Sequence, residues 1–134
     1  MAEQWSDAVE NASLDARETA IGASPTLEIR TGAAPANCAA ADSGSLLATI
    51  ALPADWMAAA SARSKVKAGT WSVAATGAGT AGHARIKQGA TCHWQAPITQ
   101  GTVAVVGELV LVNTNIAATQ VVTVNQFTIT GEPA

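Results

Sequence analysis

The spacing of apolar residues changes at Pro25, and this change limits most strongly what the chain can fold into. Before Pro25, apolar residues and alanines recur every three or four positions, which is the spacing of one helix face. After it, apolar residues alternate with polar ones, as they do on half-buried β-strands. We therefore expect an N-terminal helical arm over residues 1–22 and a β-sandwich domain over residues 23–134.

The expected helix runs from about Gln4 to Ile21, a segment without glycine or proline that is rich in Ala, Glu, Arg and Leu. Gly22 and Pro25 supply the stop signal. A narrow stripe of small or apolar residues follows one face, and such a stripe buries little area by itself. We expect it to contact its own sheet or another subunit. The stripe consists of Trp5, Val9, Ala12, Ala16 and Ala20.

The rest of the chain predicts a mainly β fold of about eight strands. We expect an antiparallel β-sandwich or jelly-roll-like barrel, preceded by the α-helix. A turn at 88–90 joins two of the strands into a hairpin, and 55–62 reads as a short helical turn. The expected strands cover 26–31, 46–52, 65–75, 82–87, 91–96, 101–106, 109–112 and 121–130.

The stretch Gly32–Ser45 is a long loop of small and turn-forming residues, and we expect a mobile or partner-contacting arm there. Pro35 and Cys38 in this loop are candidate interface residues. We expect Cys38 and Cys92 to be free, buried, small apolar side chains. A single bridge between them after release into an oxidising medium is the alternative.

Charge and hydropathy exclude several classes of protein. The chain has 134 residues, which fits one domain, and a formal net charge of −3. With no basic cluster, we do not expect it to bind nucleic acid. No apolar run approaches the ~20 residues that span a bilayer, and the acidic start lacks the apolar core of a secretory signal. We expect a soluble protein made in a cytoplasm.

A literal G-x-G-x-x-G occurs at Gly77–Gly82, where a dinucleotide fold would place its pyrophosphate. The residues that follow are strand-like, and no acidic residue lies ~20 positions further on to hold a ribose. We expect a flexible loop between strands and no cofactor.

Metal and catalytic sites are not expected either. His83, Cys92 and His93 are possible zinc ligands, but alternation places the histidines on opposite strand faces from Cys92. No nucleophile elbow is present. Half of the 10 acidic residues lie in the N-terminal helical segment, where they resemble a solvated face. We expect no enzyme.

The chain contains 4 tryptophans but only 1 Phe and no Tyr. Trp71 and Trp94 fall on alternating apolar faces, so we expect them to pack in the core. Trp5 would be costly to leave in water and suits an anchor between subunits. Tryptophans exposed on a β-sandwich can also stack on sugar rings, so a carbohydrate-binding module is the alternative.

The order of these features resembles a group of short structural proteins encoded by tailed bacteriophages and prophages. The resemblance spans nearly the whole chain, but its motifs are structural and supply no catalytic residues. It is carried by residues 16–22 (ARETAIG), 27–35 (LEIRTGAAP), 46–53 (LLATIALP), 79–86 (GTAGHARI) and the ending 121–132.

The resemblance implies a non-enzymatic virion component present in many copies. We expect a capsid decoration protein that contacts neighbouring subunits, with a neck or tail accessory protein and a host-attachment module for glycans as alternatives. The implied partners are further copies of the chain and other virion proteins, namely major capsid, neck or tail proteins. The expected subunit interface comprises Trp5, Val9, Ala12, Ala16, Pro35 and Cys38.

Overall fold

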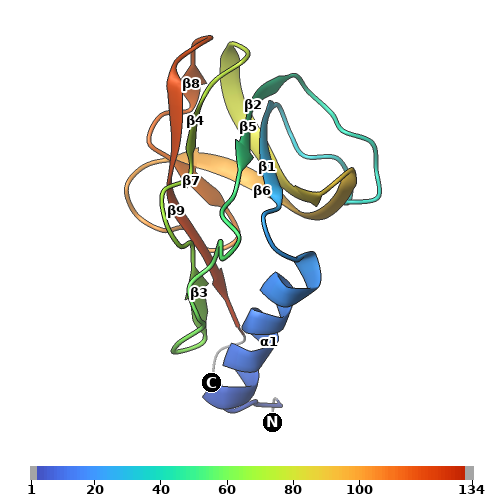
Figure 1. The fold of residues 1–134 in the computed structure, drawn as a ribbon, viewed down its shortest axis with the longest axis vertical. Helices are drawn as coiled ribbons and strands as arrows, with labels where there is room; N and C mark the ends of the chain where they lie inside the picture. The colour runs from blue at the N-terminus through green and yellow to red at the C-terminus, as the bar shows by residue number, and fades with distance from the viewer. Residues whose placement is uncertain (1–2, 132–134) are drawn as a thin grey trace.

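The computed structural model describes residues 3–131, which form one helix followed by nine strands (Figure 1). Residues 1–2 and 132–134, the outer ends of the two expected units, lie outside the described part. The chain is mainly β with an N-terminal helix, as the change of period at Pro25 predicts.

Helix α1 (Asp7–Ile21) is defined by its two ends. It begins three residues later than Gln4 because the Ser6 side chain accepts a hydrogen bond from the backbone N–H of Val9 at 3.3 Å. At the other end, Gly22 adopts a φ of +96°, and its N–H donates to the Glu18 carbonyl at 3.0 Å. The predicted stop at Gly22 is confirmed.

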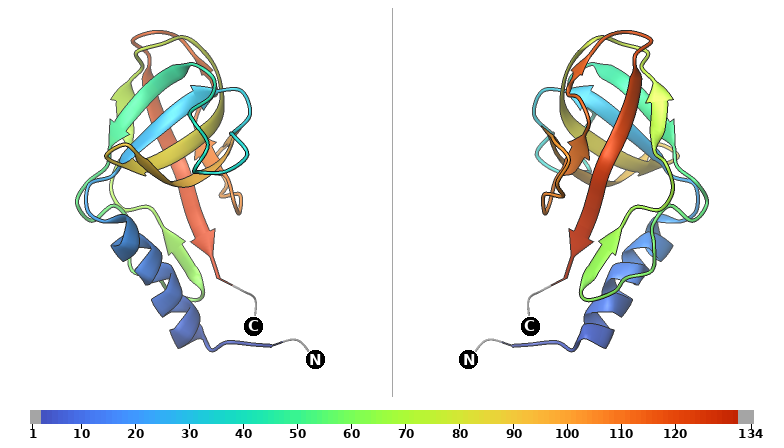
Figure 2. Two further views of the ribbon diagram at one scale, coloured as in Figure 1. Left: turned by 90° about the vertical axis from the view of Figure 1, so that its right-hand side faces the viewer. Right: turned by 90° about the vertical axis from the view of Figure 1, so that its left-hand side faces the viewer.

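The strands form one curled, mixed sheet in the order β2-β1-β5-β6-β7-β9-β3, with β4 paired to β9 and β8 paired to β5. Figure 2 shows the sheet rolled into a half-barrel, with α1 extending from it beside β3. The strands are β1 (Thr26–Thr31), β2 (Leu46–Ala51), β3 (Ser64–Val66), β4 (Ser72–Ala74), β5 (Gly79–Gln88), β6 (Thr91–Gln100), β7 (Leu109–Leu111), β8 (Asn115–Ile116) and β9 (Val121–Thr130).

The sheet is not purely antiparallel, and the expected antiparallel sandwich or jelly roll is not confirmed. Strands β6 and β7 pair in parallel, from Ile98 opposite Leu109 to Gln100 opposite Leu111. Parallel neighbours usually need a long crossover. The short connection 101–108 suffices here because β7 pairs only with the last three residues of β6.

Three local expectations were wrong. The segment 101–106 is a loop in which Val103 and Val106 are exposed, although its composition is strand-like. The expected strand 65–75 is divided into β3 and β4 by a turn at Gly69, whose φ is +72°. The segment 55–62 is not helical, and Met57 forms an isolated bridge with Lys67 instead.

The predicted hairpin between β5 and β6 is confirmed and is longer at both strands than expected. Its turn is Gly89-Ala90, and the register places His83 opposite Pro97, with a bulge between Ile86 and Lys87. The inward face of β5 carries Ala84 and Ile86, both fully buried, as the alternation predicts.

The core is centred on a cluster of aromatic side chains. Trp71 is fully buried, with its ring centroid 6.2 Å from Trp56 and 5.4 Å from Phe127. Trp94 is half-buried and stands edge-on to Phe127 at 4.9 Å. The expectation that Trp71 and Trp94 pack in the core is confirmed. Trp71 therefore offers no platform for a sugar ring.

Candidate functional site

The expected interface stripe lies on the outward side of α1. Trp5 is 50 % exposed and Val9 is 48 % exposed, and Ala12 and Ala16 are exposed as well. The opposite side of the helix is buried at Leu14, which is 0 % exposed. We call Trp5, Val9, Ala12, Ala16 and Ala20 the outer stripe.

The inner side of α1 is attached to the β part of the chain mainly by polar groups. Three side chains of the helix accept hydrogen bonds from backbone N–H groups of the segment 57–63. Asn11 accepts from Arg63 at 2.9 Å, Asp15 accepts from Ala60 at 2.9 Å, and Glu18 accepts from Met57 at 3.2 Å. The helix thereby satisfies backbone N–H groups of a segment that pairs with its neighbours only through isolated bridges.

Lys65 is the ionic centre of this attachment. Its side chain is 1 % exposed, and its ammonium lies 2.5 Å from Asp15 and 2.9 Å from Glu18. Burial alone would lower the pKa of Lys65, but the hydrogen bonds and charges of the two carboxylates outweigh it and raise that pKa above its ordinary value. The hydrogen bonds from Lys65 and from the Ala60 N–H lower the pKa of Asp15.

The residues before α1 are held by Arg63. Its guanidinium forms an ion pair with Asp7 at 2.6 Å and also donates to the carbonyl of Trp5. The Trp5 backbone is therefore fixed while its indole remains half in solvent. The helical arm is docked on the β part rather than hanging free, and its outer stripe faces away from that contact.

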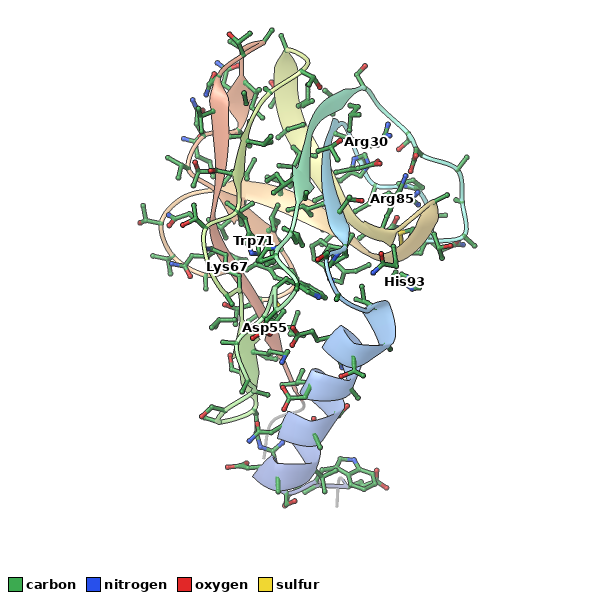
Figure 3. The ribbon with its side chains drawn as sticks, in the orientation of Figure 1. Arg30, Asp55, Lys67, Trp71, Arg85 and His93 are labelled. Atoms are coloured by element: carbon green, nitrogen blue, oxygen red, sulfur yellow. A yellow bond between two sulfur atoms is a disulfide. The ribbon has the colours of Figure 1, made fainter. Side chains whose placement is uncertain are left out.

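A cavity of about 270 Å³ lies between the C-terminal half of α1 and the half-barrel. Its walls are mostly apolar, and the charged residues Arg17, Glu18 and Lys65 also line it. His93 borders it and stands near the C-terminal end of α1 (Figure 3). The apolar lining consists of Ala20, Ile21, Trp56, Met57, Ile86, Trp94, Phe127 and Ile129.

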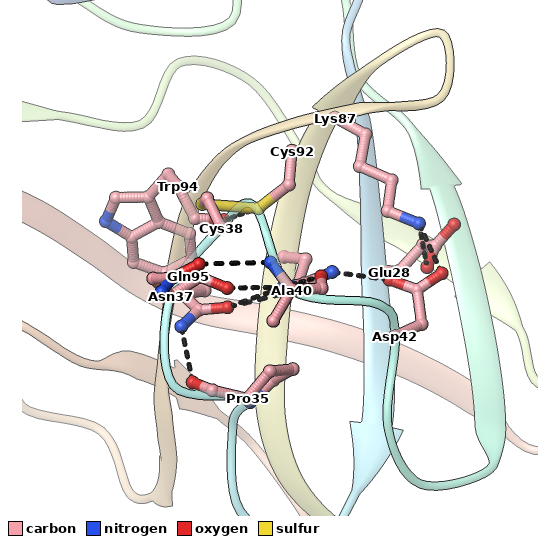
Figure 4. The surroundings of a disulfide bond; sticks show 11 residues. Glu28, Pro35, Asn37, Cys38, Ala40, Asp42, Lys87, Cys92, Trp94 and Gln95 are labelled. Carbon is pink, nitrogen blue, oxygen red and sulfur yellow. Dashed lines mark hydrogen bonds and ion pairs between the residues drawn. A yellow bond between two sulfur atoms is a disulfide. The ribbon is translucent and has the colours of Figure 1, made fainter.

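The loop 32–45 is tied to the sheet by a disulfide between Cys38 and Cys92, which are 54 residues apart with Cα atoms separated by 5.2 Å (Figure 4). The expectation of free cysteines was wrong, and the alternative of one bridge is what the structure shows. Alternation along each segment cannot reveal this pairing, because it depends on the loop returning over the outer face of β5 and β6.

Asp42 adds an ionic attachment to the same loop. Its carboxylate lies 2.7 Å from Arg85, 2.7 Å from Lys87 and 3.3 Å from Arg30. The hydrogen bond from Lys87, together with that from Arg85, outweighs the effect of burial and lowers the pKa of Asp42 to about 2. The loop is thus a fixed cover over β5, which explains why Arg85 is only 2 % exposed.

Pro35 and Cys38, the loop residues expected at an interface, are both half-buried. The Pro35 carbonyl accepts a hydrogen bond from Gln95 of β6 at 2.8 Å, and Cys38 is in the disulfide. The expected mobile arm is therefore corrected: both residues belong to the attachment of the loop.

The glycines of the G-x-G-x-x-G serve close packing of the backbone. A Cβ at Gly77 would stand 2.7 Å from the Leu46 carbonyl oxygen, and one at Gly82 would collide with the backbone of Gly32. Gly79 and Gly82 lie within β5, and no helix follows them. Gly77 and Ala78 lie in the connection between β4 and β5, whereas Gly79–Gly82, expected in the loop, belongs to β5.

The three possible zinc ligands are not brought together. Cys92 is in the disulfide, His93 is exposed, and His83 is buried under the loop with its Nδ1 2.9 Å from the Gly32 carbonyl. Its Nε2 is buried without a hydrogen-bond partner. Residues 3–131 contain no group of three or more His, Cys, Asp or Glu side chains arranged to hold a metal ion.

The roles of Lys65 and Asp42 and the presence of the cavity were not predicted from the sequence. Asp42 could have been noticed, because it is the only charged residue in a loop of small ones. Lys65 carried no such signal, since a lysine at the start of a strand is ordinary on a solvent-facing edge.

No helix within residues 3–131 is both long and apolar enough to span a membrane. Comparisons of the chain with protein-family models, with curated proteins and with solved structures gave no match.

Proposed function

We propose that this chain is a non-enzymatic structural protein of a tailed-bacteriophage virion, made in the host cytoplasm and built into the particle. Its leading role is that of a capsid decoration protein that contacts neighbouring subunits. The observation that carries the proposal is the outer stripe of α1, where Trp5 and Val9 are about half exposed. The helix displaying it is fixed from behind by Lys65 and Arg63.

The energetics favour contact with a partner. Burying a large apolar side chain contributes about 1.5–3 kcal/mol. One such contact is weak, but many copies on a symmetric particle act together through their high effective concentration. A helix already held in place also binds with less loss of conformational entropy than a free arm would.

The disulfide supports the same proposal. Such bonds persist in oxidising surroundings, including the surfaces of virions, and are rare in a reducing cytoplasm. A particle protein meets oxidising conditions after cell lysis, when Cys38 and Cys92 can pair. The resemblance to phage structural proteins across most of the chain points in the same direction.

The glycan-binding alternative has less support. Trp56 and Trp71 are buried, and Trp94 packs on Phe127. Among the tryptophans, only Trp5 is substantially exposed, and it precedes a helix. Titration with oligosaccharides should leave the tryptophan fluorescence unchanged; a saturable change that Trp5→Ala removes would favour the glycan role.

The test is incorporation into particles from the phage or lysogen that encodes the chain. Quantitative mass spectrometry should detect it at a copy number comparable with that of the major capsid protein. A few copies per particle would assign it to the neck or tail, and its absence from purified particles would refute the proposal.

Substitution of the outer stripe should reduce this incorporation by at least tenfold. The variant Trp5→Ala with Val9→Ala removes the two apolar anchors without disturbing Asp7 or Leu14. The matched control is Val103→Ala with Val106→Ala, which alters two exposed valines in the 101–108 loop and should be incorporated normally. Equal loss in both variants would show that the stripe is not the contact.

A further inference from the structure

The exposed anchor and the apolar cavity lie at opposite ends of α1. Trp5 precedes the first turn, whereas the cavity is lined by residues of the last turn and a half, from Arg17 to Ile21. The 15 residues of α1 span about 22 Å at a rise of about 1.5 Å per residue. The indole of one chain therefore cannot reach the cavity of the same chain.

The cavity suits one large apolar side chain. Its volume of about 270 Å³ is below the roughly 300–1,000 Å³ of sites that bind drug-sized ligands. Trp94 and Phe127 form an edge-to-face pair in its wall, and an incoming ring can extend that arrangement. A tryptophan is also the residue type that most often anchors protein interfaces.

The charges at the two ends are complementary. The segment before α1 carries the acidic residue Glu3, whereas Arg17 and His93 border the cavity. Asp7 is already paired with Arg63, and the Glu18 carboxylate in the cavity wall is paired with Lys65, so the attraction joins Glu3 to Arg17. Within the described chain, neither the Arg17 nor the His93 side chain is engaged in a hydrogen bond or an ion pair. Both are available for an acidic segment, which favours entry of the N-terminal segment in particular.

We propose that two copies of this chain pair through antiparallel α1 helices, each seating its Trp5 in the cavity of the other. Because anchor and cavity are separated by the same distance in both copies, an antiparallel arrangement satisfies both contacts at once. Such a two-fold interface is self-complementary. Ala12 and Ala16 lie midway and allow the helices to approach closely, and Ala20 belongs to both the outer stripe and the cavity wall.

This pairing deepens the proposed function by naming one neighbour, a second copy, and so rests on that proposal. Its test uses the full oxidised chain in a concentration series, with mass measured by light scattering or sedimentation. The chain should be dimeric. Trp5→Ala should weaken dimerisation about 1,000-fold, because losing an anchor of this kind costs about 30-fold and the symmetric interface loses two.

A second variant blocks the cavity instead of removing the anchor. Ala20→Trp places an indole in the cavity wall from an exposed helix position, so it should fold and be monomeric. Two controls should stay dimeric: Trp5→Phe, which keeps an aromatic anchor, and Ala118→Trp, which makes the same change on an exposed loop. Unchanged near-ultraviolet circular dichroism confirms folding in each case.

Mixing the two defective variants gives the sharpest result. Trp5→Ala retains an intact cavity and Ala20→Trp retains an intact anchor, so together they should form a heterodimer with one good contact. Its dissociation constant should be about 30-fold above that of the native dimer. A monomeric native chain, a dimeric Trp5→Ala variant, or a mixture that does not pair would each overturn the inference.

Failure of this inference can be told apart from failure of the proposed function. A chain that is monomeric in solution yet abundant in particles retains the virion role and refutes the pairing. A chain that dimerises through Trp5 but is absent from particles keeps the pairing and refutes the virion role.

Discussion

Lys65 shows how much of the architecture depends on one residue that the sequence does not mark. It is the central residue of a strand of only three residues, yet its ammonium connects the β part to two carboxylates of α1. The same ammonium also donates to the Ala58 carbonyl within the β part. Apart from Leu14 and the half-buried Ile21, the helix contributes little apolar area. The orientation of the outer stripe therefore depends on ionic and hydrogen-bonded contacts around Lys65.

Replacing Lys65 with methionine should lower the free energy of unfolding by about 2 kcal/mol. The substitution keeps most of the packing but leaves Asp15 and Glu18 without their cation. The loss stays moderate because the Asp15 side chain is 47 % exposed and remains partly hydrated. Denaturant unfolding measures the change. Lys67→Met is the matched control, since within residues 3–131 the Lys67 ammonium donates to the Gly69 carbonyl and to no carboxylate, and an equal loss there would contradict the assignment.

The elements that the sequence predicted correctly are those that depend on residues close together in the chain. The helix stop at Gly22, the inward face of β5 and the β5–β6 hairpin follow from capping, alternation and a short turn. The division of 65–75 into two strands and the loop at 101–106 could not be predicted in this way, because each depends on which other strand is available for pairing. The position of the loop 32–45 over β5 was not predicted for the same reason, since the disulfide that attaches the loop joins residues 54 positions apart.

The covering loop 32–45 is attached at several points, among them the disulfide, the Asp42 ion pairs and the Gln95–Pro35 hydrogen bond, and breaking one should loosen it without releasing it. The double variant Cys38→Ser, Cys92→Ser should lose about 2–4 kcal/mol of stability, because the unfolded chain is no longer cross-linked across 54 residues. Asp42 should still hold the loop to Arg85 and Lys87. Hydrogen exchange should therefore quicken at Cys38–Ala41 while β5 stays protected. Loss of protection throughout β5 would show that the disulfide alone secures the cover.

The whole molecule combines an apolar half-barrel with two polar attachments, one for the helix and one for the loop. The sequence predicts the mainly β class but not the strand order. In that order, β3 and β4 both pair with β9, and β7 runs parallel to β6. Such pairings come from long-range packing rather than from the period of any one strand. Both attachments contain ion pairs, so the stability of the molecule should depend on pH.

Stability should be greatest near neutral pH and should fall in acid. The pKa of Asp42 is about 2 in the folded chain, below its ordinary value of 3.8, so its stabilising effect is complete above about pH 5 and is lost as the pH falls through about 2. Asp15, whose pKa is also lowered, acts in the same direction. Because 31 % of the Asp42 side chain is exposed, water screens the network and its share of the loss should be about 1 kcal/mol.

The opposite sign holds for Lys65, whose raised pKa confers stability that disappears only in strong alkali. Urea unfolding between pH 2 and 8 measures the acid limb, and Asp42→Asn should make it shallower. Asp55→Asn removes the same charge from an exposed position outside both attachments and should leave the limb unchanged. If Asp42→Asn retained the full acid dependence, the loop network would not be its source, and the attachment of α1 through Asp15 would have to supply it.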